Sequence, residues 1–151
     1  MNKDILLEKI IYLNKDSKKL FDKSMKQIAK KYDLTKSEVF ILSIIKHNPE
    51  TLKSCTIVKN HNFSKAYVSQ VTNSLKEKGY ISLVTDSDDK RYQRIKLLNK
   101  ADNVLNEITK VFKVNLNIIK KGITKEELDN FIGIIDKIIK NLKDYEEENN
   151  D

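Results

Sequence analysis

One β-prone hairpin interrupts a chain whose apolar residues otherwise recur at helical spacing. Its two runs, residues 80–85 and 95–98, flank a polar turn. Only three glycines and one proline occur among the 151 residues, and these are the residues that most often interrupt helices. The sequence therefore predicts a mainly α-helical protein with one small β-hairpin.

The first half of the chain is predicted to begin with two helices. Apolar residues three, four and seven positions apart predict a long helix over residues 4–32. Thr35-Lys36-Ser37-Glu38 has the form of a capping box, in which the side chains of the first and last residues bind each other's backbone amides. This box is expected to open a second helix that ends near His47.

A helix pair is predicted next. Thr51 is expected to cap a short third helix with Cys55 facing inward, and residues 60–62 are polar and turn-prone. Ser64 is expected to cap a fourth helix, and Gly79 to end it, since glycine adopts a positive φ at little cost. A hairpin directly after a helix pair is typical of a winged helix-turn-helix.

Two long amphipathic helices are predicted after the hairpin. Asn99 is expected to cap the first, over residues 99–120, and a second capping box precedes the other, over residues 125–143. The last eight residues, 144–151, hold five acids and no base, and we interpret them as a frayed, solvated tail. The apolar stripes of the outer helices are wide, which favours a dimer interface built from both ends of the chain.

The positive charge is concentrated in the middle of the chain. The net charge is +7, and residues 51–100 carry ten cations against four anions. Both arginines, Arg91 and Arg94, lie in the hairpin, although 29 residues are basic. Arginine presents a flat, weakly hydrated fork that suits phosphates and narrow grooves. This distribution indicates a polyanionic partner that is met by the middle segment.

The fourth helix has the composition of a base-reading helix. At 100° per residue, Val68, Val71, Thr72 and Leu75 form one face that is expected to pack on the core. Short polar side chains and lysines occupy the rest of its circumference, where asparagine and glutamine can pair with adenine and lysine with phosphate. The candidate DNA-binding residues are Ser64, Lys65, Ala66, Ser69, Gln70, Asn73 and Lys76.

The hairpin tip supplies the remaining candidates. Arg91, with Lys90 beside it, is the candidate for insertion into an adjacent minor groove, where A·T-rich sequence deepens the negative potential. Asp89 would be repelled by phosphate, so its expected role is to orient Arg91 or to bind turn amides. Arg94 lies three residues further along, on the returning strand, and is expected to reach the DNA backbone.

These features resemble the MarR family of multiple-antibiotic-resistance-type transcriptional regulators over roughly residues 4–143. The motifs that carry the resemblance are Leu34-Thr35 with Glu38, Leu75-Lys76-Glu77-Lys78-Gly79-Tyr80-Ile81, Asp89-Lys90-Arg91, Lys96-Leu97-Leu98-Asn99, and Gly122-Ile123-Thr124 with Glu127. The Asp-x-Arg motif in the wing is the most specific of them. The arginine that often follows the recognition helix in this family is absent, with Ser82 and Leu83 in its place.

The resemblance implies a single MarR-type domain over residues 1–151. Residues 33–98 would form the DNA-binding head, residues 1–32 and 99–143 the dimerisation helices, and residues 144–151 the tail. It further implies a homodimer that binds a pseudo-palindromic double-stranded DNA operator, as a repressor released by a small-molecule effector. The single cysteine, Cys55, excludes an internal disulfide framework and fits a reducing, cytoplasmic location. No cofactor is implied.

Other function classes find little support. His47 and His61 are expected at helix ends, no catalytic motif appears, and the spacing of Cys55 and His61 matches no standard metal site. No apolar run approaches the roughly 20 residues that span a membrane, and the N-terminus lacks a signal-peptide layout. Two alternatives stay open: an adaptor that uses the winged-helix shape without reading DNA, and a regulator that senses oxidants through Cys55.

Overall fold

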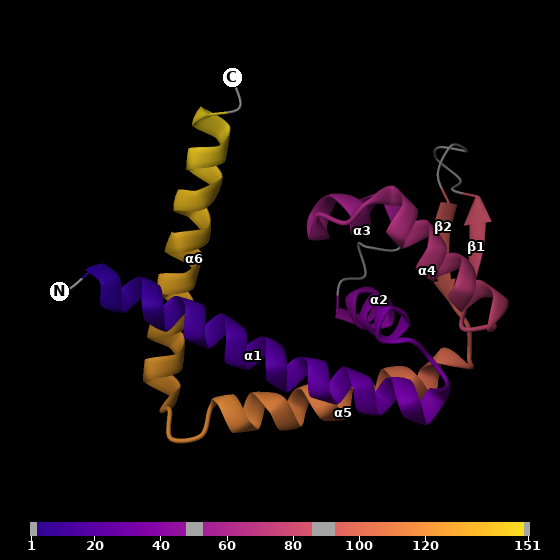
Figure 1. Cartoon of the computed structure of the whole chain (residues 1–151), viewed down its shortest axis with the longest axis horizontal. Helices are drawn as coiled ribbons and strands as arrows, with labels where there is room; N and C mark the ends of the chain where they lie inside the picture. The colour runs from indigo at the N-terminus through magenta and orange to yellow at the C-terminus, as the bar shows by residue number, and fades with distance from the viewer. Residues whose placement is uncertain (1–2, 48–52, 86–92, 150–151) are drawn as a thin grey trace. The chain divides into compact units, whose positions relative to one another are not determined.

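The computed structural model describes residues 3–47, 53–85 and 93–149 (Figure 1). A first unit comprises residues 1–113 and a second unit residues 114–151. The predicted fold class, mainly helical with a single β-hairpin, is confirmed. In chain order the elements are α1 (Lys3–Tyr32), α2 (Lys36–His47), α3 (Ser54–His61), α4 (Lys65–Glu77), β1 (Ile81–Thr85), β2 (Gln93–Leu97), α5 (Ala101–Ile119) and α6 (Lys125–Glu148).

The junction between α1 and α2 is fixed by backbone geometry and by the predicted capping box. Asp33 adopts a φ of 53°, and the Leu34 amide donates to the Ala29 carbonyl at 2.9 Å, which closes the end of α1. The Thr35 amide donates to the Glu38 carboxylate at 2.6 Å, and the Glu38 amide donates to the Thr35 hydroxyl at 3.2 Å. The capping box is thereby confirmed.

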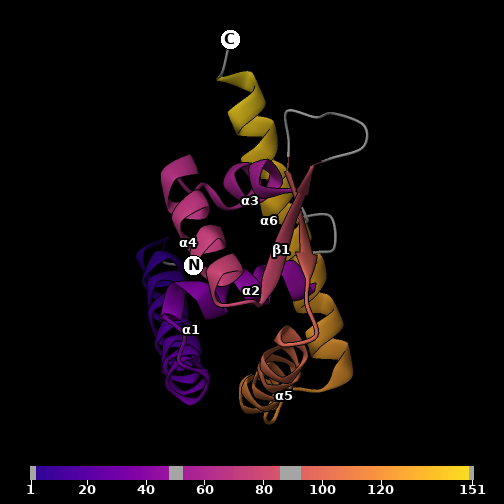
Figure 2. The ribbon, with the colours of Figure 1, turned by 90° about the vertical axis from the view of Figure 1, so that its right-hand side faces the viewer.

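The hairpin is a regular antiparallel pair beside α4 (Figure 2). Ile81 lies opposite Leu97 and Thr85 opposite Gln93. Lys53, just before α3, forms an additional antiparallel bridge with Arg94. This bridge joins the start of the helix pair to the hairpin. It is a contact within the predicted head, residues 33–98, between residues 41 positions apart in sequence.

A single hydrophobic core fills the first unit. It draws residues from both strands and from each of its five helices, and hydrogen bonds and ring contacts join α1 to α5. Phe21 and Phe112 have ring centroids 5.2 Å apart, and the Tyr32 hydroxyl donates to the Asn103 carbonyl at 3.2 Å. The largest side chains that are almost fully buried there are Ile28, Ile41, Leu42, Ile57, Leu75, Ile81, Ile95 and Ile108.

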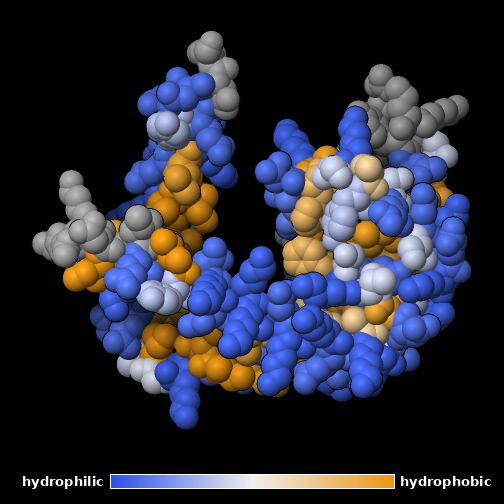
Figure 3. All heavy atoms as spheres, in the orientation of Figure 1, coloured by the Kyte–Doolittle hydropathy of each residue, from blue (hydrophilic) through white to orange (hydrophobic). Residues whose placement is uncertain are grey.

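The second unit presents an amphipathic helix without buried residues. Gly122 has a φ of 80°, and the predicted capping box of Thr124 and Glu127 opens α6. None of the residues of α6 is buried, and Figure 3 shows apolar side chains exposed along it. The exposed large apolar residues of α6 are Phe131, Ile132, Ile134, Ile135, Ile138, Ile139, Leu142 and Tyr145.

Three predictions about local structure are wrong. The third helix begins at Ser54 with Lys53 as its N-cap residue, so Thr51, which lies outside the described residues, is not its cap. Cys55 is exposed rather than facing inward. The acidic segment is not frayed throughout, because α6 continues to Glu148. Within the described parts of the chain, no helix has the length and apolarity needed to cross a bilayer.

Replacing Gly79 with alanine is expected to lower the free energy of unfolding by about 1 kcal/mol. Gly79 has a φ of +75°, and a Cβ placed there would meet nothing within 4 Å, so the cost is backbone strain alone. Gly133, within α6, also has open space around it but no positive φ, so alanine there is expected to stabilise the helix. Urea unfolding of both variants measures the difference; equal effects would contradict it.

Candidate nucleic-acid interface

The helix α4 begins where the sequence predicted. The Ser64 hydroxyl accepts a hydrogen bond from the Tyr67 amide at 3.1 Å, and Lys78 follows the helix as its C-cap residue. The Thr72 hydroxyl is buried and donates to the Val68 carbonyl at 2.8 Å, so this polar side chain is satisfied inside the head. The predicted inner face is confirmed, since Val68, Val71, Thr72 and Leu75 are the buried residues of α4.

The outer face of α4 is exposed along its whole length. It carries two lysines near its ends and short polar side chains between them, with no apolar side chain larger than alanine among the candidates. All seven candidate residues on and before this helix are exposed: Ser64, Lys65, Ala66, Ser69, Gln70, Asn73 and Lys76. The structure thus brings them together on one accessible surface. Their contact with DNA stays a prediction.

A left-handed residue and an aromatic cluster set the corner between α3 and α4. Asn62 has a φ of 52°, and the Phe63 amide donates to the Val58 carbonyl at 3.3 Å. The Phe63 ring lies 5.0 Å from the Tyr67 ring and 6.0 Å from the Phe40 ring. Aromatic pairs at these distances add packing energy beyond their buried area, so the angle of α4 is held by α2 and by the corner.

A buried carboxylate, Glu38, connects the start of α2 to the end of α4. Its side chain is 1% exposed. One oxygen accepts from the Ser74 hydroxyl at 2.6 Å, and the other accepts from the Lys78 ammonium at 2.9 Å and from the Thr35 amide. Burial alone would raise the pKa of Glu38, but the hydrogen bonds from Ser74, Thr35 and Lys78 outweigh it and lower that pKa.

The lysines that follow α4 extend this network. The Lys78 ammonium also donates to the Asp33 carbonyl at 3.1 Å, and the Lys100 ammonium donates to the Lys78 carbonyl at 2.7 Å. Lys100 further lies 4.7 Å from the centre of the Tyr80 ring. Two of the cations in the basic middle segment therefore have structural partners. No sequence pattern predicted that Lys78 and Lys100 make these structural contacts, because their partners are distant along the chain.

The hairpin supplies one described candidate. Arg94 lies on β2, opposite Val84, and is partly exposed. Its place on the returning strand is as predicted, and its bridge to Lys53 also holds it beside α3. The other candidates of the hairpin, Asp89, Lys90 and Arg91, lie outside the described residues.

A family model described as transcriptional regulator SarA/Rot matches residues 23–108, which is more than half of the chain. The chain belongs to the SarA/Rot family of transcriptional regulators. The matched span runs from the second half of α1 to the first half of α5 and contains the whole described head.

Solved structures of MarR regulators share the fold of this SarA/Rot regulator. The transcription regulator MarR from Oenococcus oeni is 21% identical with a TM-score of 0.62, over 91% of this chain and 98% of that one. A MarR protein from Peptoclostridium difficile is 21% identical with a TM-score of 0.73, over 96% and 91%. A MarR family regulator from Listeria monocytogenes, complexed with a 26mer DNA, is 18% identical with a TM-score of 0.74, over 96% and 95%. The predicted resemblance to MarR regulators is confirmed.

An apolar pocket lies inside the first unit of the regulator, between α1, α2, α4 and α5. Its volume is about 480 Å³. Aromatic side chains and one methionine form much of its wall, and the charged residues Lys18, Asp22 and Lys36 also line it. The remaining lining residues are Phe21, Met25, Ser37, Phe40, Tyr67 and Phe112. No sequence motif predicts this pocket, because its lining residues come from four helices.

The two histidines have ordinary roles at the helix ends where they were expected. The His47 ring nitrogen Nδ1 lies 2.9 Å from the Ser43 carbonyl, and its ring is 4.8 Å from that of Phe112. The His61 ring stacks on Phe63 with centroids 5.9 Å apart. Across the described ranges, no group of three histidine, cysteine or acidic side chains is arranged to hold a metal ion.

Proposed function

We propose that this regulator is a repressor that binds a pseudo-palindromic DNA operator as a homodimer and reads bases with α4. The observation that carries the proposal is the two-sided character of α4. Its apolar side is locked into the core, while Gln70 and Asn73 are exposed on the other side between lysines. A helix of this kind enters a major groove, where amide side chains discriminate adenine and lysines bind phosphate.

The position of Arg94 supports the same assignment. It is anchored by the hairpin register and by its bridge to Lys53, so it lies on a rigid element beside the helix pair. The Listeria monocytogenes neighbour of the same fold was solved in complex with a 26mer DNA. A duplex engaged by α4 would also be within reach of the hairpin. The predicted minor-groove arginine, Arg91, falls in the sequence between its two strands, outside the described residues.

Selection of bound duplexes from a random pool tests the proposal. We expect a two-fold symmetric, A·T-rich motif with half-sites about one helical turn apart. Failure to enrich any motif at low salt would contradict DNA reading and would favour the adaptor function. A motif without two-fold symmetry would contradict the homodimer while leaving base reading intact.

Two substitutions on α4 are expected to act differently. Asn73→Ala should cost about 1–3 kcal/mol of affinity for the selected motif and relax the preference at one base position. Lys76→Gln should instead weaken binding to all sequences alike, because it removes a phosphate contact. Titrations with the selected duplex and with a scrambled duplex separate the two outcomes. If Asn73→Ala weakens both duplexes equally, Asn73 does not read a base.

The apolar pocket supports release of DNA by a small-molecule effector. It lies where α1 and α5 meet α2 and α4, and the Tyr67 side chain that lines it belongs to the first turn of α4. A ligand bound there would shift α4 relative to α1 only if it bound two arrangements of these helices with different affinity. A ligand that occupies the pocket without changing the operator Kd would contradict this role.

A further inference from the structure

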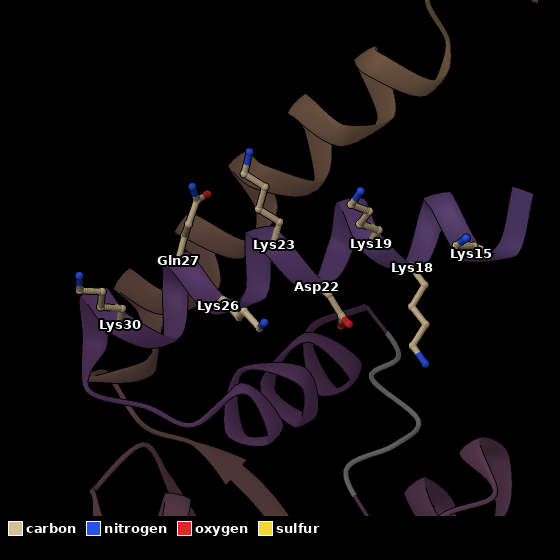
Figure 4. Close-up of a pocket in the computed structure, with 8 residues that line it drawn as sticks. All are labelled: Lys15, Lys18, Lys19, Asp22, Lys23, Lys26, Gln27 and Lys30. Atoms are coloured by element: carbon tan, nitrogen blue, oxygen red, sulfur yellow. The ribbon is translucent and has the colours of Figure 1, made fainter. Parts of the chain in front are cut away.

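A broad row of lysines follows the exposed side of α1 (Figure 4). In Figure 4, Lys19, Lys23 and Lys30 point to one side of the helix, and Lys18 and Lys26 point to the other. Every member of the row is exposed. We call this surface the lysine ridge and define it as Lys15, Lys18, Lys19, Lys23, Lys26 and Lys30.

The spacing of the ridge puts all six cations on one part of the helix circumference. At 100° per residue they fall within an arc of roughly 140°. At 1.5 Å per residue, the ridge from Lys15 to Lys30 is about 22 Å long. The ridge is therefore an extended basic surface that a linear polyanion can follow.

This arrangement opposes helix stability in the free protein. Lysines four residues apart, such as Lys15 and Lys19 or Lys19 and Lys23, repel each other by a few tenths of a kcal/mol per pair. The same stretch of α1 contains two acids, Asp16 and Asp22, and Asp22 is paired with Lys36 of α2 at 3.2 Å. Within the described ranges, none of the six ridge lysines forms an ion pair. The ridge thus has a net positive charge, and an anionic partner would reduce the repulsion between its lysines.

We propose that the lysine ridge binds the phosphate backbone of a DNA duplex, as a second contact separate from the base-reading surface of α4. This inference rests on the proposed function and deepens it. The ridge contains lysine and no arginine. Its ammonium groups act as point charges and lack the planar guanidinium that binds phosphate in a fixed, two-pronged geometry. Contacts of this type add affinity that is salt-dependent and independent of base sequence.

Within the first unit, the ridge helix α1 packs against α2, and α2 packs against α4. Lys18 and Asp22 of α1 line the same apolar pocket as Lys36 of α2 and Tyr67 of α4. Tyr67 is three residues after the Ser64 cap that starts the proposed reading helix. Duplex DNA that is bent or extends beyond the α4 contacts can therefore meet the ridge on the same molecule.

A second copy of the chain offers a competing anionic surface, the acidic end of α6. Its acids Glu146, Glu147 and Glu148 are consecutive, so they point in directions about 100° apart around the helix. Such a helix end can present only part of its acids to the lysine ridge at one time. A duplex, in contrast, carries one charge per about 1.7 Å along its axis. The geometry of the ridge therefore favours DNA.

Neutralising the centre of the ridge tests the proposal. In the full chain, the triple variant Lys19→Gln, Lys23→Gln and Lys26→Gln is compared with a control that loses the same charge elsewhere. The control variant changes Lys113, Lys120 and Lys121, all exposed, to glutamine. Glutamine and lysine have similar helix propensity, so both proteins are expected to fold, and unfolding curves check this.

The salt dependence of Kd is measured for duplexes of about 20 and about 40 base pairs. The shorter duplex holds two half-sites one turn apart, and the longer one adds flanking DNA that can reach the ridge. The slope of log Kd against log salt concentration falls by about 0.9 for each phosphate contact that is lost. We expect the ridge variant to lose up to about 2.7 from the slope on the longer duplex. Its selected sequence motif should not change, and the control should keep the wild-type slope.

The outcomes separate the two proposals. An unchanged slope in the ridge variant, with selective binding retained, would overturn the ridge and leave the function of α4 intact. A ridge-dependent slope without any selected motif would overturn the base-reading function but support the ridge. If the ridge variant keeps the wild-type slope but forms a weakened, salt-sensitive dimer, the ridge binds the acidic end of α6 of a second copy instead of DNA. Absence of duplex binding by the wild type would overturn both.

Discussion

Replacing Glu38 with alanine is expected to lower the free energy of unfolding by about 3 kcal/mol. The loss has two sources. The buried carboxylate is the common acceptor for Ser74, Lys78 and Thr35. Without it the Ser74 hydroxyl and the Thr35 amide lose their acceptor at a part-buried site, while the Lys78 ammonium, with its side chain 35% exposed, keeps access to water. The smaller side chain also leaves space beside α4. Urea unfolding followed by circular dichroism measures the change.

The charge of Glu38 can be tested separately from its volume. Glu38→Gln keeps the shape of the side chain but loses one oxygen acceptor and the pairing with Lys78. Because the pKa of Glu38 is lowered in the folded protein, its contribution is present at neutral pH and is lost as the pH falls through that pKa. The stability advantage of the wild type over Glu38→Gln should therefore be present at pH 7 and shrink as the solution is made more acidic, through the lowered pKa of Glu38.

Glu107 provides the matched control for this experiment. It pairs with Lys31 at 2.8 Å, but both side chains are partly solvated, at 29% and 57% exposure. Exposed ion pairs contribute little to stability, so Glu107→Gln should leave the unfolding curve at neutral pH nearly unchanged. Equal losses for Glu38→Gln and Glu107→Gln would show that the buried network does not hold α4.

Features encoded by neighbouring residues could be predicted from the sequence. Both capping boxes, the Ser64 cap and the position of Gly79 depend on residues at most four positions apart, and all of them are confirmed. The inner face of α4 also follows from local periodicity. These signals were enough to place the helix that is proposed to read DNA.

Features that depend on distant partners were missed. The partners of Glu38 on α4 lie 36 and 40 residues further along, so its capping role was visible and its second role was not. A distant partner also explains the wrong prediction at α3, where the sequence predicted Thr51 as the N-cap residue. Lys53 is instead held in extended conformation beside Arg94, and the helix starts after it. Ile57 faces the core, and Cys55, two positions earlier and so about 200° away around the helix, is exposed.

Placing an aspartate in the apolar stripe of α6 is expected to abolish the proposed homodimer. Phe131, Ile135, Ile138, Ile139 and Leu142 share one side of this helix, and α6 has no buried residue. A stable amphipathic helix normally buries such a stripe against a partner surface. Ile135→Asp would place a charge in that interface, at a cost of several kcal/mol. Analytical ultracentrifugation at micromolar concentration should then detect monomers.

Asn130→Asp adds the same charge at an exposed position about 140° around α6 from Ile135, outside the stripe, so this variant should remain dimeric. Loss of the dimer should also weaken binding to a two-half-site duplex far more than binding to a single half-site, because only a dimer engages both half-sites at once. A dimeric Ile135→Asp protein would place the interface elsewhere. A dimer lost equally in both variants would mean that net charge, rather than the apolar stripe, governs association, since only the position of the new carboxylate differs between them.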